Sequence, residues 1–92
     1  MLSFCRDRHG DSAVEYAKTE REWAERAARH LKAELKRAKL TYEDLATRMK
    51  EHGFEETEAS VASKLSRATV PAAFFLAALV AIGCEVVKLK DI

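Results

Sequence analysis

The sequence predicts an all-α fold of four to five helices, and three observations support this prediction. The good helix formers Ala, Glu, Lys, Arg and Leu dominate the 92 residues. The chain contains only three glycines and one proline, which are too few turn residues for an all-β fold. Apolar residues also recur at helical spacing in several segments. A chain of this length forms one domain, which we place at residues 19–92, after an N-terminal arm or short helix at residues 1–18.

The first long helix is predicted to end near Ala38, and two starts fit the sequence. Ser12 and Thr19 each begin a capping-box pattern, with a Glu three residues later. The helix therefore begins near residue 12 or near residue 19. Its apolar face, with spacings of 4, 3, 4 and 3, consists of Ala24, Ala28, Leu31, Leu35 and Ala38. Trp23 widens this face, and we expect its side chain in the core.

The charges of the chain nearly balance, with 16 Lys and Arg against 15 Asp and Glu and a net charge of +1. The chain as a whole therefore has no positive field that would attract nucleic acid, and DNA binding requires a local basic patch. In the first helix, Glu22 precedes Arg26 and Glu25 precedes Arg29 by four residues, which is the favourable order for ion pairs. We interpret these charges as a solvated face.

The second helix is predicted to begin after Thr41, whose hydroxyl can cap it, with acidic residues in the first turn. Its apolar residues recur at i, i+3, i+4 and i+7 and are Tyr42, Leu45, Ala46 and Met49. Gly53 is a natural stop for this helix.

The third helix is predicted over residues 58–66, with Thr57 as its cap. Its apolar side is narrow and consists mainly of Val61 and Leu65. The opposite side carries short hydroxyls and two cations, namely Ser60, Ser63, Lys64 and Arg67. A helix with this pattern can lie in a groove.

The fourth helix is predicted over residues 72–82, between Pro71 and Gly83. It is apolar on every side, which is typical of a central core helix or of half of a subunit interface. After it, residues 87–90 alternate between apolar and basic. This alternation predicts either a short C-terminal β-strand or an extended tail.

Three stretches of the chain resemble the phage-repressor (lambda repressor-like) type of helix-turn-helix domain. Residues 35–46 are similar to its opening helix followed by a Thr-capped helix with a Leu-Ala pair. Residues 61–67 are similar to its recognition helix, and residues 75–83 to its closing helix. The resemblance implies a helix-turn-helix within the all-α fold, with the recognition helix in the major groove of DNA.

The sequence departs from that motif in two places. Ala46 precedes Val61 by fifteen positions, against about ten in the usual motif, so the second helix, the turn or both are longer. Ala68 stands where the motif usually has glycine.

More narrowly, residues 20–83 resemble a small uncharacterised proteobacterial domain family. The shared features are a Trp, the stretches Leu-Lys-x-Glu-Leu and Tyr-x-x-Leu-Ala, and the sequences Glu-Thr-Glu-Ala-Ser-Val and Phe-Phe-Leu. This resemblance brings no assigned function.

The helix-turn-helix resemblance implies a DNA-binding site on the recognition helix and on two further basic clusters. The expected residues are Thr57, Ser60, Ser63, Lys64, Arg67, Lys36, Arg37, Lys39, Arg48 and Lys50. Lys64 and Arg67 are expected to make the strongest contacts, through charge-assisted hydrogen bonds to phosphate or guanine. Glu55, Glu56 and Glu58 crowd the start of the same helix and would repel phosphate. In the N-terminal arm, Arg6 and Arg8 can reach a minor groove.

The expected partner is double-stranded DNA, bound by a homodimer, because paired modules match palindromic half-sites. The dimer interface is expected at apolar residues of the fourth helix and the tail, namely Phe74, Phe75, Leu79, Val86 and Leu89. This interpretation makes the chain a sequence-specific or architectural DNA-binding protein, acting as a small bacterial or phage transcriptional regulator. The alternative is a non-catalytic protein-protein interaction module on the same scaffold, which would expose apolar side chains such as Phe54 in place of a basic surface.

Signals for other classes of protein are weak. The chain has no Gly-rich phosphate loop and no HExxH or GxSxG motif, so we expect no enzyme activity and no cofactor. The spacing of Cys5 and His9 is the one metal-like pattern, and a lone pair of ligands does not make a zinc site. The longest apolar run, residues 70–83, is too short to span a bilayer. Without a signal peptide, we expect a cytoplasmic location.

Overall fold

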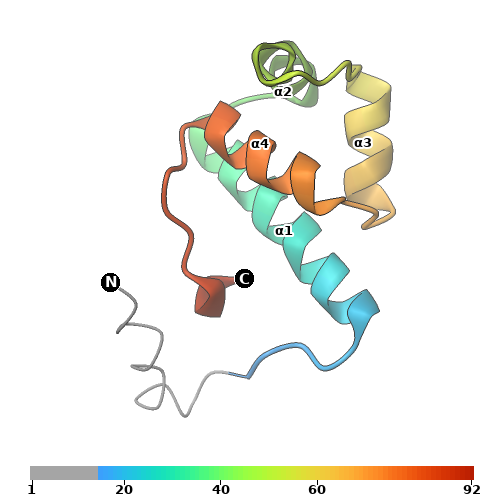
Figure 1. Ribbon diagram of the computed structural model, residues 1–92, viewed down its shortest axis with the longest axis vertical. Helices are drawn as coiled ribbons and strands as arrows, with labels where there is room; N and C mark the ends of the chain where they lie inside the picture. Colours follow the sequence, from blue (N-terminus) through green and yellow to red (C-terminus); the bar gives the residue numbers. More distant parts are fainter. Residues whose placement is uncertain (1–14) are drawn as a thin grey trace.

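The computed structural model describes residues 15–92 and contains four α-helices and two short 3-10 helices in this range (Figure 1). The helices are α1 (Glu20–Ala38), α2 (Tyr42–Met49), α3 (Glu58–Ser66) and α4 (Ala72–Ile82), with 3-10 helices η2 (Lys50–His52) and η3 (Leu89–Asp91). The all-α prediction is confirmed. The predictions for Ser12, Arg6 and Arg8 and for the Cys5–His9 spacing lie outside the described residues, as does most of the arm assigned to residues 1–18.

Helix α1 begins at the second of the two predicted starts. Thr19 is the N-cap, and its Oγ1 accepts a hydrogen bond of 3.0 Å from the Glu22 backbone N–H. The Glu22 carboxylate accepts from the Lys18 N–H at 3.2 Å, so the cap is not the reciprocal box that the sequence predicts. The helix ends at Lys39, whose φ of 60° places it in the left-handed region.

The core face of α1 is correctly predicted except at its aromatic residue. Ala28, Leu31 and Leu35 are buried. Trp23, however, is 41% exposed and stacks on Tyr16, with 6.2 Å between the ring centroids. The expectation that Trp23 lies in the core is wrong, because its position on the helix is turned away from Leu31 and Leu35.

Helix α2 begins with a complete capping box. The Thr41 N–H donates to Asp44 Oδ2 and the Asp44 N–H donates to Thr41 Oγ1, both at 3.0 Å. The hydrogen bond from the Thr41 backbone lowers the pKa of the Asp44 carboxyl below its ordinary value. Leu45, Ala46 and Met49 are buried, as the periodicity predicts.

The extra residues between the second and third helices lie in the connection and do not lengthen α2. The chain continues from Met49 into η2, turns at Gly53 with a φ of 87°, and runs without regular structure to Thr57. This connection is longer than the three- or four-residue turn of the usual helix-turn-helix. Helices α2 and α3 nevertheless pack against each other and cross steeply in Figure 1.

The core lies where all four α-helices meet. Its largest fully buried side chains are Phe74, Leu31, Leu45, Met49, Leu65 and Val61. Helix α1 packs against α3 and α4, and α2 packs against the same two helices. The Arg48 guanidinium also joins α2 to the end of α4, since its Nη1 donates to the Ala81 carbonyl oxygen at 3.0 Å.

The segment after α4 differs from one of the two predictions. Gly83 ends α4 with a φ of 106°, and residues 84–88 have no regular structure before η3. Residues 15–92 contain no strand, so the predicted C-terminal β-strand is wrong. A four-residue alternation does not form a strand here because it has no second strand to pair with.

None of the described helices is long and apolar enough to cross a membrane.

Candidate nucleic-acid interface

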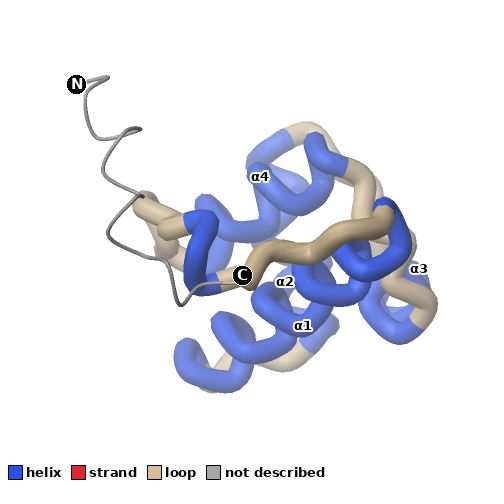
Figure 2. Tube along the Cα trace, turned by 90° about the horizontal axis from the view of Figure 1, so that it is seen from below, coloured by secondary structure: helices blue, strands red, loops and turns tan. Residues whose placement is uncertain are grey.

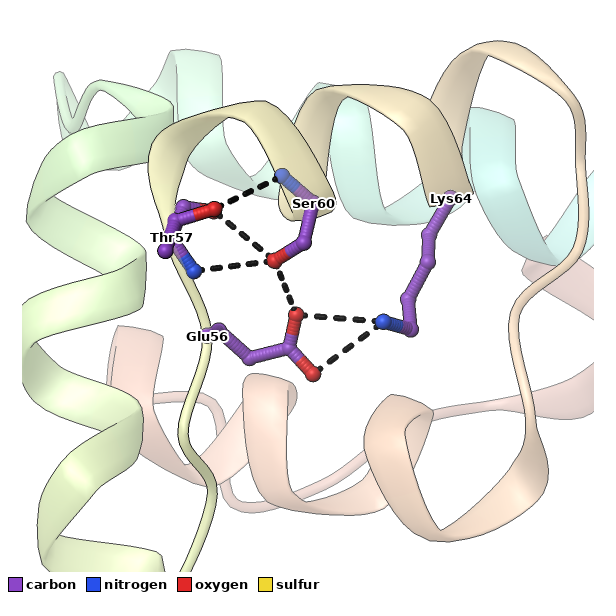
Figure 3. Close-up of polar contacts among 4 residues, drawn as sticks. All are labelled: Glu56, Thr57, Ser60 and Lys64. Carbon is purple, nitrogen blue, oxygen red and sulfur yellow. Dashed lines mark hydrogen bonds and ion pairs between the residues drawn. The ribbon is translucent and has the colours of Figure 1, made fainter.

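Four residues form one hydrogen-bonded cluster that extends from the loop before α3 to the last turn of the helix (Figure 3). The Thr57 N–H donates to Ser60 Oγ at 2.9 Å, and the Ser60 N–H donates to Thr57 Oγ1 at 3.1 Å. The Ser60 hydroxyl donates to Glu56 Oε1 at 2.5 Å. Lys64 Nζ lies 3.1 Å and 3.2 Å from the two carboxylate oxygens of Glu56. The polar groups of Thr57 and Ser60 at the first turn of α3 thus already have hydrogen-bond partners within the protein.

Lys64 is held on two sides. Its ammonium group pairs with Glu56 and also lies 5.3 Å from the centroid of the Phe74 ring, within the range of a cation–π contact. The side chain of Lys64 is 29% exposed and that of Glu56 only 9% exposed. The structure therefore brings together three of the predicted DNA contacts, Thr57, Ser60 and Lys64, as partners of one another and of Glu56.

The outer side of α3 carries small side chains and one cation. Ala59 and Ser66 are exposed, Ala62 and Ser63 are half-buried, and Arg67 is exposed at the C-cap. Arg67 forms no ion pair within residues 15–92. It lines a shallow depression with Glu20, Arg21 and Ala24 of α1, so the end of α3 adjoins α1.

The opposite end of α3 is acidic. Glu55 and Glu58 are exposed next to the N-terminus of the helix, where negative charge is electrostatically favourable. These carboxylates stabilise the helix end and would repel a phosphate group. The charge at α3 therefore changes sign along its length, from acidic at Glu55 and Glu58 to basic at Arg67.

The remaining predicted cations differ in their surroundings. Lys36, Lys39 and Lys50 are exposed and form no ion pair in the described part of the chain. Arg37 is paired with Glu34 at 2.6 Å. Arg48 is bonded to the Ala81 carbonyl oxygen. Lys36, Arg37 and Lys39 lie together at the C-terminal end of α1.

Sequence reasoning missed the other members of a charged row along α1. The row, which we call the α1 stripe, follows the spacing 3, 4, 4, 3, 4 and 3 and consists of Lys18, Arg21, Glu25, Arg29, Lys32, Lys36 and Lys39, all exposed. Glu25 pairs with Arg21 at 3.2 Å, not with Arg29 as the sequence predicts. The predicted pair of Glu22 and Arg26 is present at 3.0 Å. The same periodicity rule that located the apolar face of α1, applied to its basic residues, would have found the stripe.

Two of the five residues assigned to a dimer interface belong to the core of the single chain. Phe74 is 1% exposed and Leu79 is buried, so neither side chain is accessible to a second copy. Phe75 is half-buried and packs on His30, with 6.3 Å between ring centroids. Val86 and Leu89 are exposed in the segment after α4. The exposed large apolar side chains of α4 are instead Leu76 and Val80.

The fold and surface define a small all-α domain of four α-helices in the described residues, with α3 at its edge. The chain belongs to the DUF6471 family, a domain of unknown function whose family model matches residues 23–87. The match extends from Trp23 through all of α2, α3 and α4, and it confirms the resemblance to an uncharacterised family. No curated protein and no solved structure matches the chain.

Proposed function

We propose that residues 19–92 form a non-catalytic domain that binds double-stranded DNA as a small bacterial or phage transcriptional regulator. The observation that carries this proposal is the position of α3. It follows α2 in a helix-turn-helix order, lies at the edge of the bundle (Figure 1), and ends in an exposed Arg67 without an ionic partner in the described residues. This arrangement resembles the phage-repressor type, with a longer connection between its two helices.

The charge distribution on α3 supports contact through its C-terminal half. Thr57, Ser60 and Lys64 are occupied by Glu56 and by one another, and exposed acids lie beside them. Of the four polar residues predicted on the DNA-facing side of α3, only Ser63 and Arg67 remain available for DNA. Small side chains on the outer side of α3 allow its backbone to approach a groove closely. Contact through the C-terminal half differs from the usual motif, in which N-terminal residues of the recognition helix meet the bases.

Fluorescence anisotropy with a random-sequence duplex across a salt series tests the proposal. We expect binding whose logarithm falls linearly with the logarithm of salt concentration, because neutralised phosphates release counterions. Arg67→Gln should weaken binding, since Arg67 is exposed and forms no internal ion pair. Folded protein that does not bind the duplex at the lowest salt concentration would contradict the proposal.

A second candidate function, a protein-protein interaction module, is favoured by one observation. Leu76 and Val80 are 63% and 56% exposed and lie one helical turn apart on α4, a helix without a charged residue. Such a pair can pack against a second copy of the chain or against another protein. Sedimentation equilibrium of the wild type and of Leu76→Gln/Val80→Gln tests the homodimer. A wild-type dimer that becomes a monomer in the variant would assign the interface to α4.

A further inference from the structure

The α1 stripe is an exposed basic surface that the helix-turn-helix resemblance does not assign. Five of its positions fall on one side of the 19-residue helix, Lys39 is its C-cap, and Lys18 precedes its N-cap. At 1.5 Å per residue, the distance along the axis from Arg21 to Lys39 is about 27 Å. Six of the seven side chains are basic, and the one acid, Glu25, is paired with Arg21.

The four cations at the C-terminal part of the stripe are not paired with an acid in the described residues, although Arg29 borders a depression that Asp91 also lines. Arg29, Lys32, Lys36 and Lys39 form no ion pair within residues 15–92. Two carboxylates of α1 outside the stripe are engaged with other cations, since Glu22 is bonded to Arg26 and Glu34 to Arg37. Within a chain of net charge +1, the positive charge is thus concentrated on one face.

The stripe is uncovered. The buried residues of α1 face α3 and α4, and Figure 2 shows α1 and α4 on opposite sides of the bundle. Arg21 of the stripe and Arg67 at the C-cap of α3 line the same depression, together with Glu20, so the stripe adjoins the end of α3. From Arg29 to Lys39, neighbouring cations are three or four positions apart, which places their Cβ atoms about 5–6 Å apart.

We propose that the α1 stripe binds the phosphate backbone of duplex DNA and supplies most of the electrostatic part of the affinity, with Arg29, Lys32, Lys36 and Lys39 as the contacting residues. This inference rests on the proposed DNA binding and goes beyond it, because it moves the main phosphate contact from α2 and α3 to α1. A regular row of exposed, unpaired cations matches a polymer that carries negative charge at regular intervals. A protein partner is expected to make apolar contacts in addition to ion pairs, and the stripe consists of charged side chains only.

The test compares two double variants with equal changes in charge. Lys32→Gln/Lys36→Gln removes two charges from the stripe, and Lys88→Gln/Lys90→Gln removes two from exposed positions after α4. Glutamine keeps a good helix propensity, and thermal melting of each variant checks that the fold is intact. Anisotropy across a salt series with a random-sequence duplex then gives the number of phosphate contacts. Each lost contact lowers the slope of log K against log salt by about 0.9.

We expect the slope to decrease by about 1.8 in the stripe variant, from two lost contacts, and to stay near the wild-type value in the control. Lys32→Arg/Lys36→Arg should keep the wild-type slope, because it keeps both charges. If the wild type binds DNA and the stripe variant loses no more than the control, the stripe inference is wrong while the proposed function stands. If the wild type does not bind the duplex at all, both fail. Equal binding of single-stranded RNA or heparin, with the same loss in the stripe variant, would overturn duplex DNA as the partner.

Discussion

Helix α3 and the outer face of α1 both carry lysines, which are paired on α3 and unpaired on α1. In the last turn of α3, Lys64 is half-buried and bound to both carboxylate oxygens of Glu56. On α1, Lys32 and Lys36 are exposed and form no ion pair in the described residues. The lysine of α3 is thus held inside the fold by an ion pair, while the lysines of α1 are accessible to a partner. The acids that the fold places nearby decide the difference.

The largest expected effect on stability comes from removing the internal ion pair of Lys64 and Glu56. Lys64→Ala leaves the Glu56 carboxylate nearly buried without its cation and removes the contact with the Phe74 ring. Removing one partner of a fully buried pair costs about 3–5 kcal/mol. Because Lys64 is partly exposed, we expect the free energy of unfolding to decrease by about 2 kcal/mol, measured by urea denaturation.

Lys36→Ala on the α1 stripe is the matched control for Lys64→Ala. An exposed lysine without a partner should change the free energy of unfolding by no more than about 0.5 kcal/mol. Equal effects of the two substitutions would show that the internal pair does not stabilise the fold and would remove the contrast between the two regions.

A smaller effect is expected at the cap of α3. Thr57→Ala removes the acceptor of the Ser60 N–H, and the loss of such a cap costs about 1 kcal/mol. Thr57→Ser keeps the hydroxyl and should keep most of the stability. Urea denaturation of the two variants measures the difference. If alanine and serine behave alike, the hydroxyl does not stabilise the start of α3.

Helices α1 and α3 are each followed by a non-glycine residue with a positive φ, and substitutions there can affect stability and DNA binding differently. Lys39 at the end of α1 and Ala68 after α3 have φ values of 60° and 56°, in the left-handed region that favours glycine. We expect Lys39→Gly and Ala68→Gly each to raise the free energy of unfolding by about 0.5 kcal/mol, because relief of backbone strain exceeds the added entropy cost.

The same two substitutions distinguish the α1 stripe from the residues that follow α3. Lys39→Gly also removes a cation of the stripe, and its salt slope for duplex DNA should fall by about 0.9. Ala68→Gly should leave that slope unchanged. A loss of slope in both variants, measured by anisotropy, would indicate that backbone geometry and not charge determines binding.

The smallest effect concerns acid stability at the cap of α2. The pKa of Asp44 is lowered in the folded protein by the hydrogen bond from the Thr41 backbone. Its contribution to stability is therefore fully present above the unfolded pKa of about 3.9 and is lost as the pH falls through the lower, folded value. The difference in unfolding free energy between the wild type and Asp44→Asn should shrink between pH 6 and pH 3. The same comparison with the exposed neighbour variant Glu43→Gln serves as the control, and an unchanged difference for Asp44→Asn would contradict the assignment.

Most of the fold could be predicted from local signals. The bounds of the third and fourth helices, residues 58–66 and 72–82, agree with the structure because Thr57, Pro71 and Gly83 mark their ends locally. Trp23 was misplaced because an aromatic residue beside an apolar face can stack on a neighbour such as Tyr16 without entering the core. The C-terminal strand failed because strand pairing depends on a partner that four residues cannot specify.

The candidate site was less predictable because its key interaction is not periodic. Glu56 precedes α3 and reaches Lys64 across eight positions, from a loop to a helix. Helix periodicity describes pairs three or four residues apart, so it assigned Lys64 to the DNA-facing side. Arg29 was assigned to Glu25 by the same rule, and the structure gives Glu25 to Arg21 instead. In both cases a choice between competing partners determined which cation is available.

The position of Phe74 on the last α-helix has a consequence for folding during synthesis on the ribosome. Phe74 is the only aromatic among the fully buried core side chains of the described residues, and α4 contacts both α1 and α2. At a synthesis rate of about 5–20 residues per second, residues 67–82 take roughly one to three seconds to add after α3 is complete. During that interval Leu31, Leu45 and Val61 lack their central partner. The nascent chain therefore presents an unfinished apolar surface to chaperones until α4 emerges and closes it.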